Sequence, residues 1–236
     1  MTPVSSPQAS RLGIGIVGAG RVGPVLGRAL AGAGHAITGI SAVSEESRER
    51  AEAMLPGAPI LEVQEIVRRS ELVLLAIPGA EIPGLVSGLA KLGAWQPGQL
   101  VIHTAPEHGT AVFAEAPGVI PIALHPNMVF TGTSLDLARL SGATVAVTAP
   151  AVVQPIGQAL VVEMGAEPVI VSESDRQAYA EAVIVAAEAA RLATADAILT
   201  LQRLGIARAD RIVGGAVHAA VDEEAARYVG DPELGA

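Results

Sequence analysis

Short apolar runs alternate with helix-like stretches between residues 12 and 171, and this alternation constrains the fold more than any other feature. The strand-like runs lie at residues 12–17, 36–40, 60–61, 72–77, 100–103, 119–124, 144–148 and 168–171. The helix-like stretches between them lie at 21–33, 44–55, 63–69, 82–92 and 154–164. Residues 72–77 are apolar throughout, as expected of a central strand covered on both faces. The pattern predicts right-handed βαβ units in a doubly wound, mainly parallel α/β sheet.

A glycine-rich segment, Gly18-Ala19-Gly20-Arg21-Val22-Gly23, follows the first strand-like run and opens the first helix. A GxGxxG pattern in that context predicts binding of a dinucleotide. Gly18 would allow the tight turn, Gly20 the close approach of the pyrophosphate, and Gly23 the packing of the helix on the sheet. The helix N-terminus adds unpaired N–H groups and the positive end of its dipole. The other reading is a tight turn that binds nothing.

The end of the second strand bears on which dinucleotide is bound. Preference for NAD usually requires an Asp or Glu there, about 20 residues past the motif, to bind the ribose hydroxyls. Here no carboxylate precedes Glu45. The hydroxyls of Ser41 and Ser44 can hydrogen-bond a 2′-phosphate, and Arg48 can pair with it. We therefore expect NADP, with NAD as the other candidate, although Ser44 could serve only as a helix cap and Arg48 as a solvated charge.

Three segments should reach the carboxyl ends of the strands, where ligands of open α/β sheets lie. Ile77 and Pro78 close the central strand and would lie near a nicotinamide. His103 ends the next strand, and the segment from His125 to Asn127 follows the one after. Either histidine could protonate a substrate or hold its carboxylate, and we expect His125 to do so, helped by His103 or Asn127. The alternative is that each ring only hydrogen-bonds a loop backbone and fixes a turn.

Two other kinds of catalytic site are not indicated. His103 and His108 are five residues apart in an expected loop and lack the i, i+4 spacing of a zinc pair, and we interpret His108 as a surface residue. The sequence contains no cysteine and no GxSxG elbow, so a thiolate site and an α/β-hydrolase are not expected.

A long helix is predicted over residues 175–204, which contain no glycine or proline. Its polar arc is interrupted by Ile184, Val185, Leu192 and Leu199, so apolar side chains surround most of its circumference. The stretch at 207–229 is too small to bury such a helix alone, and we predict a homodimer formed through it. We expect a flexible tail at 1–10, a dinucleotide-binding domain at 11–173 and a short all-α dimerisation segment at 174–236.

The composition narrows the class of partner. A net charge of −9 argues against a nucleic-acid or anionic-membrane binder. No apolar stretch approaches the roughly 18–20 residues of a membrane span, and we expect a cytoplasmic protein. Two Phe, two Tyr and one Trp leave few rings for a substrate pocket, which favours a small polar substrate.

Three stretches together resemble a known family: the glycine-rich opening, the run through Ile77-Pro78, and Leu124-His-Pro-Asn-Met-Val-Phe-Thr-Gly-Thr133. They are similar to the Rossmann-like, DUF2520-domain proteins, which are related to pyrroline-5-carboxylate reductase and the 6-phosphogluconate dehydrogenase superfamily. The resemblance implies an NAD(P)-binding Rossmann domain, a C-terminal helical dimerisation domain, an oxidoreductase activity and an active site between the domains.

This sequence departs from the family pattern at two places. Ala105 and Pro106 stand where relatives usually have Ser-Gly, and Ala180 and Glu188 stand where relatives carry polar His and Asn. The leading hypothesis is an NADP-dependent reductase of a small keto or imino acid. The second is a dimeric dinucleotide-binding protein without catalysis, acting as a sensor or a degenerate paralogue.

Overall fold

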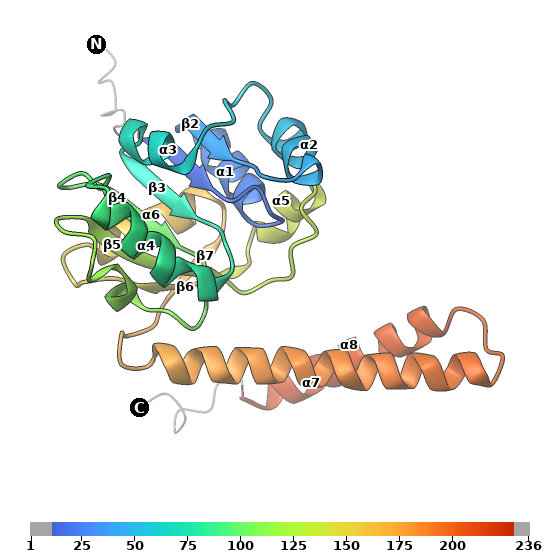
Figure 1. The fold of residues 1–236 in the computed structure, drawn as a ribbon. Helices are drawn as coiled ribbons and strands as arrows, with labels where there is room; N and C mark the ends of the chain where they lie inside the picture. The colour runs from blue at the N-terminus through green and yellow to red at the C-terminus, as the bar shows by residue number, and fades with distance from the viewer. Residues whose placement is uncertain (1–10, 229–236) are drawn as a thin grey trace, which may run out of the picture. The chain divides into compact units, whose positions relative to one another are not determined.

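In the part of the chain that the structure describes, residues 11–228 of a computed structural model, seven strands form one sheet in the order β2-β1-β3-β4-β5-β6-β7 (Figure 1). The strands are β1 (Gly13–Val17), β2 (Ala36–Ser41), β3 (Leu72–Leu75), β4 (Leu100–His103), β5 (Ile120–Pro126), β6 (Thr144–Thr148) and β7 (Glu167–Ile170). The tail expected at 1–10 lies outside the described residues.

The helices follow the alternation that the sequence predicts. They are α1 (Gly23–Gly32), α2 (Glu45–Met54), α3 (Val63–Arg69), α4 (Ile82–Lys91), α5 (Leu135–Leu140), α6 (Gln154–Glu163), α7 (Arg176–Arg203) and α8 (Ala209–Tyr228), with 3-10 turns η1 (Gly79–Glu81) and η2 (Thr110–Phe113). The chain divides into two compact units, the first ending at Tyr179 and the second beginning at Ala180. The predicted boundary at 173/174 lies in the segment between β7 and α7.

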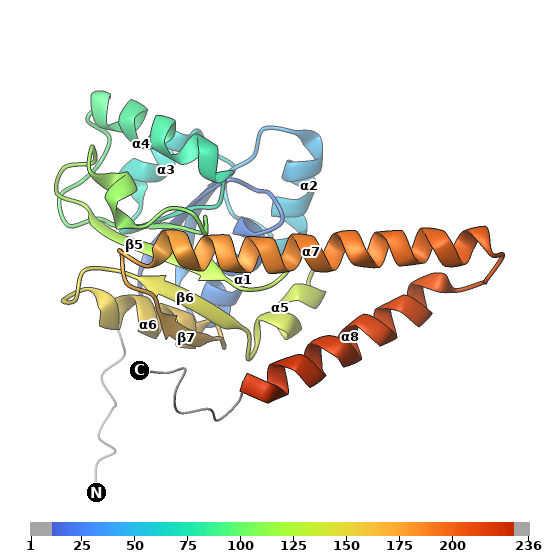
Figure 2. The same ribbon diagram turned by 90° about the horizontal axis from the view of Figure 1, so that it is seen from below.

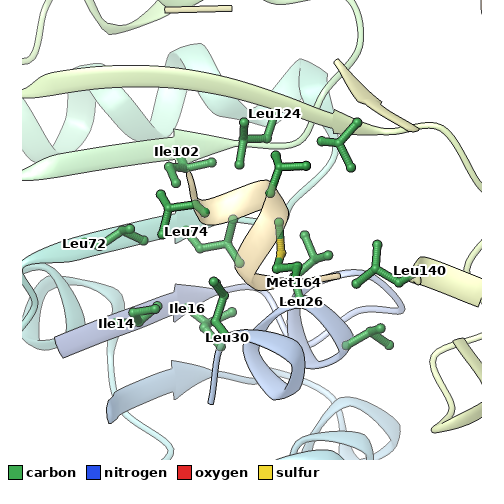
Figure 3. Close-up of a cluster of buried hydrophobic side chains, with 14 of the residues drawn as sticks. Ile14, Ile16, Leu26, Leu30, Leu72, Leu74, Ile102, Leu124, Leu140 and Met164 are labelled. Carbon is green, nitrogen blue, oxygen red and sulfur yellow. The ribbon is translucent and has the colours of Figure 1, made fainter. Parts of the chain in front are cut away.

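Each face of the sheet carries its own apolar core. Leu72 and Leu74 of β3 join a cluster with side chains from α1, α2, α5 and α6 (Figure 3). Val73 and Leu75 point to the other face, where they pack with residues of α3, α4 and η2. Successive side chains of a strand alternate between faces, so a central strand covered on both faces must be apolar at every position. The predicted doubly wound α/β fold is confirmed.

One pair of strands differs from the parallel arrangement. β6 runs antiparallel to β5, and its residues Ala146 and Val145 pair with His125 and Pro126. β5 therefore continues two residues beyond the predicted end at 124. Past Ala123, β5 no longer pairs with β4. Pro126, which has no backbone N–H, therefore removes no hydrogen bond between these two strands.

Two shorter segments also differ from the predictions. The strand expected at 60–61 is reduced to a single bridge between Ile60 and Ile40. Helix α5 was not predicted, because its six residues are too few to show a helical period. Its second residue, Asp136, has a buried carboxylate.

The second unit contains most of α7 together with α8, which turns back from the end of α7 (Figure 2). Gly205, at φ +73°, follows α7 as the predicted helix stop. Ile184, Val185, Leu192 and Leu199 are all about half exposed or more. Among the described helices, none combines the length and the hydropathy needed to cross a membrane.

Candidate functional site

The carboxyl ends of β1, β3, β4 and β5 meet at one edge of the sheet, because these strands are parallel neighbours. The predicted site residues come to this edge from the turn after β1, the segment after β3, and the ends of β4 and β5. In open α/β sheets this is the edge at which ligands bind.

A side chain would clash with the backbone at two of the three motif glycines and would be accommodated at the third. Gly18 has φ +104°, and a Cβ there would lie 2.5 Å from the carbonyl oxygen of Ala76. A Cβ on Gly23 would lie 2.2 Å from the carbonyl oxygen of Gly18. A Cβ on Gly20, by contrast, would meet no heavy atom within 4 Å, so open space lies above this residue. The turn is tight at both ends and open in the middle, as a pyrophosphate would require.

The N-terminus of α1 is free to bind an anion. No side chain caps it: Val22, the half-buried N-cap residue, makes no side-chain hydrogen bond. The first turn carries Pro24 and no acidic residue, while Arg21 just before it is exposed. The backbone N–H groups and the positive end of the dipole therefore face the position where a phosphate would lie.

A cavity of about 570 Å³ lies against the glycine-rich turn, within the range of small-molecule sites. Five predicted cofactor-binding residues line it: Gly18, Ala19, Ser41, Ser44 and Ile77. Val43, Ser47 and Glu81 also contribute to its wall. The predicted residues are thus brought together from the turn after β1, the end of β2, the N-cap of α2 and the segment after β3.

The serines of this cavity already have partners within the protein. The Ser41 hydroxyl accepts a 2.9 Å hydrogen bond from the backbone N–H of Gly18 and so holds the turn. The Ser44 hydroxyl accepts from the N–H of Ser47 at 3.2 Å and caps α2. Each hydroxyl can still donate a hydrogen bond to a ligand.

The other six predicted cofactor residues do not line this cavity: Gly20, Arg21, Val22 and Gly23 continue the glycine-rich turn, and Arg48 and Pro78 lie elsewhere. Arg48 lines a separate cavity of about 350 Å³, together with Ala42 and Glu62. Pro78 is exposed next to Ile77, and both lie in the segment after β3, because the strand ends at Leu75, two residues before the predicted end at 77.

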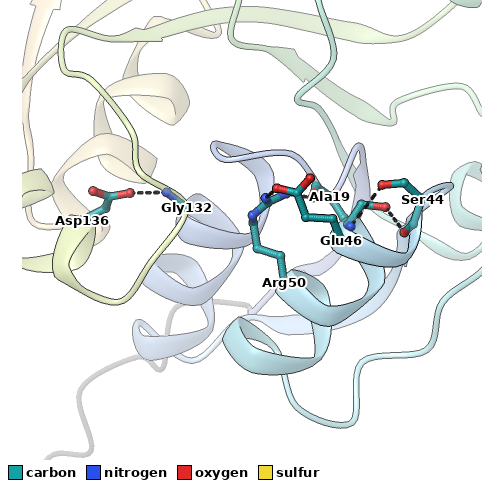
Figure 4. A network of polar contacts seen from close by, with 7 residues as sticks. Ala19, Ser44, Glu46, Arg50, Gly132 and Asp136 are labelled. Carbon is teal, nitrogen blue, oxygen red and sulfur yellow. Dashed lines mark hydrogen bonds and ion pairs between the residues drawn. The ribbon is translucent and has the colours of Figure 1, made fainter.

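Sequence reasoning did not identify Arg50, which braces the glycine-rich turn from α2 (Figure 4). Its guanidinium donates to the carbonyl of Ala19 at 3.0 Å and pairs with Glu46. Gly132 packs against it, since a Cβ there would lie 2.9 Å from Arg50 Nε. Arg50 lies two residues after Arg48 on α2, and this proximity to a predicted cofactor residue is the sequence signal that could have indicated Arg50 as a site residue.

The turn at Gly132 is held by the buried carboxylate of Asp136 (Figure 4). This carboxylate accepts hydrogen bonds of 2.7 Å from the N–H groups of Thr131 and Gly132. Burial opposes its ionisation, but these hydrogen bonds outweigh burial and lower the pKa of Asp136. The segment after β5 is thereby fixed beside the glycine-rich turn.

The structure leaves His103 no exposed surface through which to contact a substrate. Its Nε2–H donates to the carbonyl of Gly109 at 3.0 Å. Its Nδ1 has no hydrogen-bond partner among the described residues. Burial lowers the pKa of His103 to about 4, so the ring is neutral near pH 7. This geometry matches the loop-fixing alternative for His103.

His125 is half-buried on β5 and contacts the first turn of α7. Its Nδ1 lies 2.8 Å from the hydroxyl oxygen of Tyr179. Burial, followed by the charge of Arg176, lowers the pKa of His125 to about 4. Asn127, just past β5, is exposed and pairs through its backbone N–H with Thr144. Of the three candidate catalytic residues, His125 and Asn127 retain exposed surface.

The loop after β4 is tied down by side chains that sequence reasoning did not assign to the site. Arg176, almost fully buried, donates to the carbonyls of His108 and Ala105. Glu173 accepts from the N–H groups of Thr110 and Ala111.

The interpretation of His108 as a surface residue is wrong: the ring is half-buried and its Nε2 donates to the carbonyl of Gly79 at 2.9 Å. The loop is therefore fastened to the segment after β3.

Several solved structures share this fold. A candidate NADP oxidoreductase from Bacteroides fragilis has a TM-score of 0.73 at 16% identity, covering 94% of this chain and 82% of its own. A 1-pyrroline-5-carboxylate reductase from Streptococcus pyogenes has a TM-score of 0.69 at 20% identity, covering 94% and 83%. A semialdehyde dehydrogenase NAD-binding protein from Cupriavidus necator, solved with calcium and NAD, has a TM-score of 0.67 at 18% identity, covering 94% and 86%. At these identities the likeness establishes the fold.

Two family models match successive parts of the sequence. No curated protein matches the sequence. The Rossmann-like domain matches residues 2–126, and the domain of unknown function DUF2520 matches residues 143–229. The chain therefore belongs to the family of proteins that join a Rossmann-like domain to a DUF2520 domain, as the resemblance implied.

Proposed function

We propose that this protein is an NAD(P)-dependent oxidoreductase that reduces a small keto or imino acid. The observation that carries the proposal is the glycine-rich turn, closed at Gly18 and Gly23 and open at Gly20, with a cavity of about 570 Å³ beside it. An uncapped helix N-terminus completes a site for the pyrophosphate. The names of the structural neighbours, which include pyrroline-5-carboxylate reductases and an NADP oxidoreductase candidate, support the same class of activity.

The chain's own residues fit the parts of such a reaction. A bound reduced nicotinamide would supply the hydride. Gly18–Gly23 would hold the pyrophosphate, and Ile77 and Pro78 would limit the nicotinamide end of the site. His125, with Asn127 nearby, would bind the substrate and provide a proton, because it keeps exposed surface at the end of β5. His103 would act indirectly, by holding the loop at Gly109.

We propose NADP as the preferred cofactor. The cavity wall at the end of β2 is made by Ser41, Val43, Ser44 and Ser47, so it offers hydroxyl groups and no carboxylate there. A carboxylate at that position would bind ribose hydroxyls and repel a 2′-phosphate. Ser44 caps α2, and Arg48 lies four residues further on, in the wall of the separate cavity; we propose that the Arg48 side chain turns toward the 2′-phosphate when NADP binds.

We also propose a homodimer formed through α7 and the helix that follows it. Ile184 is 49% exposed, Val185 65%, Leu192 54% and Leu199 54%. A row of large aliphatic side chains at that exposure is typical of a subunit interface.

A dinucleotide-binding dimer without catalysis is the second candidate. The complete burial of His103 favours it, because one of the two candidate proton donors is withdrawn from the surface. Fluorescence titration with NADPH and NADH, followed by a screen of 2-keto acids and cyclic imines, separates the two functions. Turnover would establish the reductase, and binding without turnover across the panel would favour the second candidate. Failure to bind either nucleotide would refute both.

A further inference from the structure

The contact between His125 and Tyr179 joins residues 54 positions apart in the sequence, at the place where β5 meets the start of α7. The rings are 5.7 Å apart between centroids and nearly perpendicular, at 74°. The hydroxyl oxygen of Tyr179 lies 2.8 Å from Nδ1, a normal length for a hydrogen bond. Both residues belong to the first compact unit, so this contact is internal to it.

The chemistry of the two groups decides which of them donates. A phenol is a good donor and a weak acceptor, whereas the unprotonated nitrogen of a neutral imidazole is a strong acceptor. The stronger pairing therefore has the Tyr179 O–H donating to Nδ1. In that arrangement the ring carries its own proton on Nε2.

The other ring nitrogen remains available. Nε2 of His125 has no hydrogen-bond partner among the described residues. Among the described residues, the buried side-chain nitrogen or oxygen without a hydrogen-bond partner is His103 Nδ1. Nε2 of His125 also lacks a partner but is not a buried atom of this kind, so it keeps access to solvent. A donor that is accessible and unpaired at the end of a strand can be offered to a ligand.

We propose that Tyr179 is a positioning residue for reduction: its hydroxyl holds His125 in the tautomer that presents Nε2–H to the reacting oxygen or nitrogen of the substrate. This inference rests on the reductase function proposed above. Once hydride has been added to carbon, the electron pair of the C=O or C=N bond moves onto the heteroatom. The heteroatom takes the Nε2 proton, Nδ1 takes the phenol proton, and water returns a proton to the phenolate.

Charged neighbours of the pair favour this arrangement. Arg176 lies over the ring of Tyr179, 5.5 Å from its centroid. Burial raises the pKa of Tyr179, so the hydroxyl keeps its proton for the hydrogen bond to Nδ1, and the charge of Arg176 partly offsets the cost of a transient phenolate. The same cation, after burial, opposes protonation of His125, while Glu107 from the loop after β4 acts in the opposite direction. With a pKa lowered to about 4, the ring is a neutral hydrogen-bond donor near pH 7 and not an imidazolium.

The test compares Tyr179→Phe with Tyr228→Phe, a matched change at an exposed tyrosine in α8. Nitrogen NMR of ¹⁵N-histidine-labelled full-length protein, with His125 assigned by a His125→Asn variant, reports the tautomer directly. We expect His125 to carry its proton on Nε2 in the unmodified protein and in Tyr228→Phe. In Tyr179→Phe we expect a mixture of tautomers.

Kinetics add a second readout. In Tyr179→Phe we expect kcat to fall at least about tenfold, with KM and the NADPH dissociation constant within about twofold of the unmodified protein. A proton on Nδ1 in the unmodified protein, or an unchanged tautomer in Tyr179→Phe, would overturn the inference. The tautomer measurement needs no substrate, so it decides the inference even if NADPH binding fails and the proposed function falls.

Discussion

The guanidinium of Arg176 lies over the ring of Tyr179, 5.5 Å from its centroid, and pairs with no carboxylate among residues 11–228. It donates instead to two loop carbonyls and to the hydroxyl of Thr148 on β6. One buried cation thus joins the loop after β4, the sheet and the first turn of α7. Its charge acts on both His103 and His125 and helps to keep both rings neutral.

The buried neutral state of His103 makes stability depend on pH. Its pKa is about 4 in the folded protein against an ordinary value of 6.5, so the unfolded chain binds more protons between these limits. The free energy of unfolding should therefore fall as pH decreases from about 6.5 to 4, by up to about 1.4 kcal/mol per pH unit from His103. Above that window this contribution does not change with pH.

Urea unfolding at a series of pH values between about 7.5 and about 4.5 measures this dependence. His103→Asn should show a shallower loss of stability in acid than the unmodified protein. His218→Asn, at an exposed histidine of α8, should keep the original slope. Identical slopes for the two variants would show that His103 is not the source of the acid sensitivity.

Asp136 should contribute strongly to stability. Asp136→Asn removes a charged acceptor from the N–H groups of Thr131 and Gly132, and hydrogen bonds to charged groups are worth about 1.5–3 kcal/mol. We expect a loss of that size in the free energy of unfolding, measured by denaturant titration. Arg139→Ala should cost less than about 1 kcal/mol, because Arg139 is exposed and lies 3.7 Å from the carboxylate. Similar losses in both variants would contradict this account.

Much of the fold could be predicted because it follows from local patterns. The bounds of α3, β4 and β6 agree with the predictions at both ends. β4 and β6 are short apolar runs that follow polar or turn residues, and α3 ends before Ser70. The end of β5 could not be predicted in this way. It depends on pairing with β6, which no pattern within residues 119–126 reveals.

The shape of the glycine-rich turn could be predicted from the sequence, whereas the contacts that hold the candidate site together could not, for the same reason. Gly18–Gly23 form one contiguous motif whose geometry is local. The partners of His125 and Ala19 are Tyr179 and Arg50, which lie 54 and 31 residues away in the sequence, so no local pattern links either pair. Arg176 in particular has the sequence character of a solvated helix start, yet it is 2% exposed.

The two arginines of α2 should affect nucleotide binding differently. Arg48→Ala should weaken NADPH much more than NADH, because only NADPH carries the 2′-phosphate with which we expect Arg48 to pair. Arg50→Ala should weaken both nucleotides equally, because Arg50 braces the turn at Ala19 and not the ribose end. Fluorescence titration of both variants with both nucleotides checks this. Equal effects of Arg48→Ala on NADPH and NADH would refute its proposed role.

Charges placed on α7 should dissociate the proposed dimer. Leu192→Glu combined with Leu199→Glu puts two carboxylates on side chains that are each 54% exposed. Burying them at an interface without a partner would be costly, so we expect a monomer by light scattering after size-exclusion chromatography. Val152→Glu, at an 88% exposed position before α6, should leave the mass unchanged. A monomeric unmodified protein would refute the dimer.

Nucleotide binding at the open position of the glycine-rich turn is the central claim, and Gly20→Asp tests it most directly. A Cβ there meets no protein atom within 4 Å, so the variant should fold normally while placing a negative charge where the pyrophosphate would lie. Gly32→Asp, at an equally open position at the other end of α1, is the control. In calorimetric titrations with NADPH, we expect binding to the unmodified protein and to Gly32→Asp, and a loss of affinity of at least about 100-fold in Gly20→Asp, equivalent to about 2.7 kcal/mol. Unchanged affinity in a folded Gly20→Asp variant would contradict it.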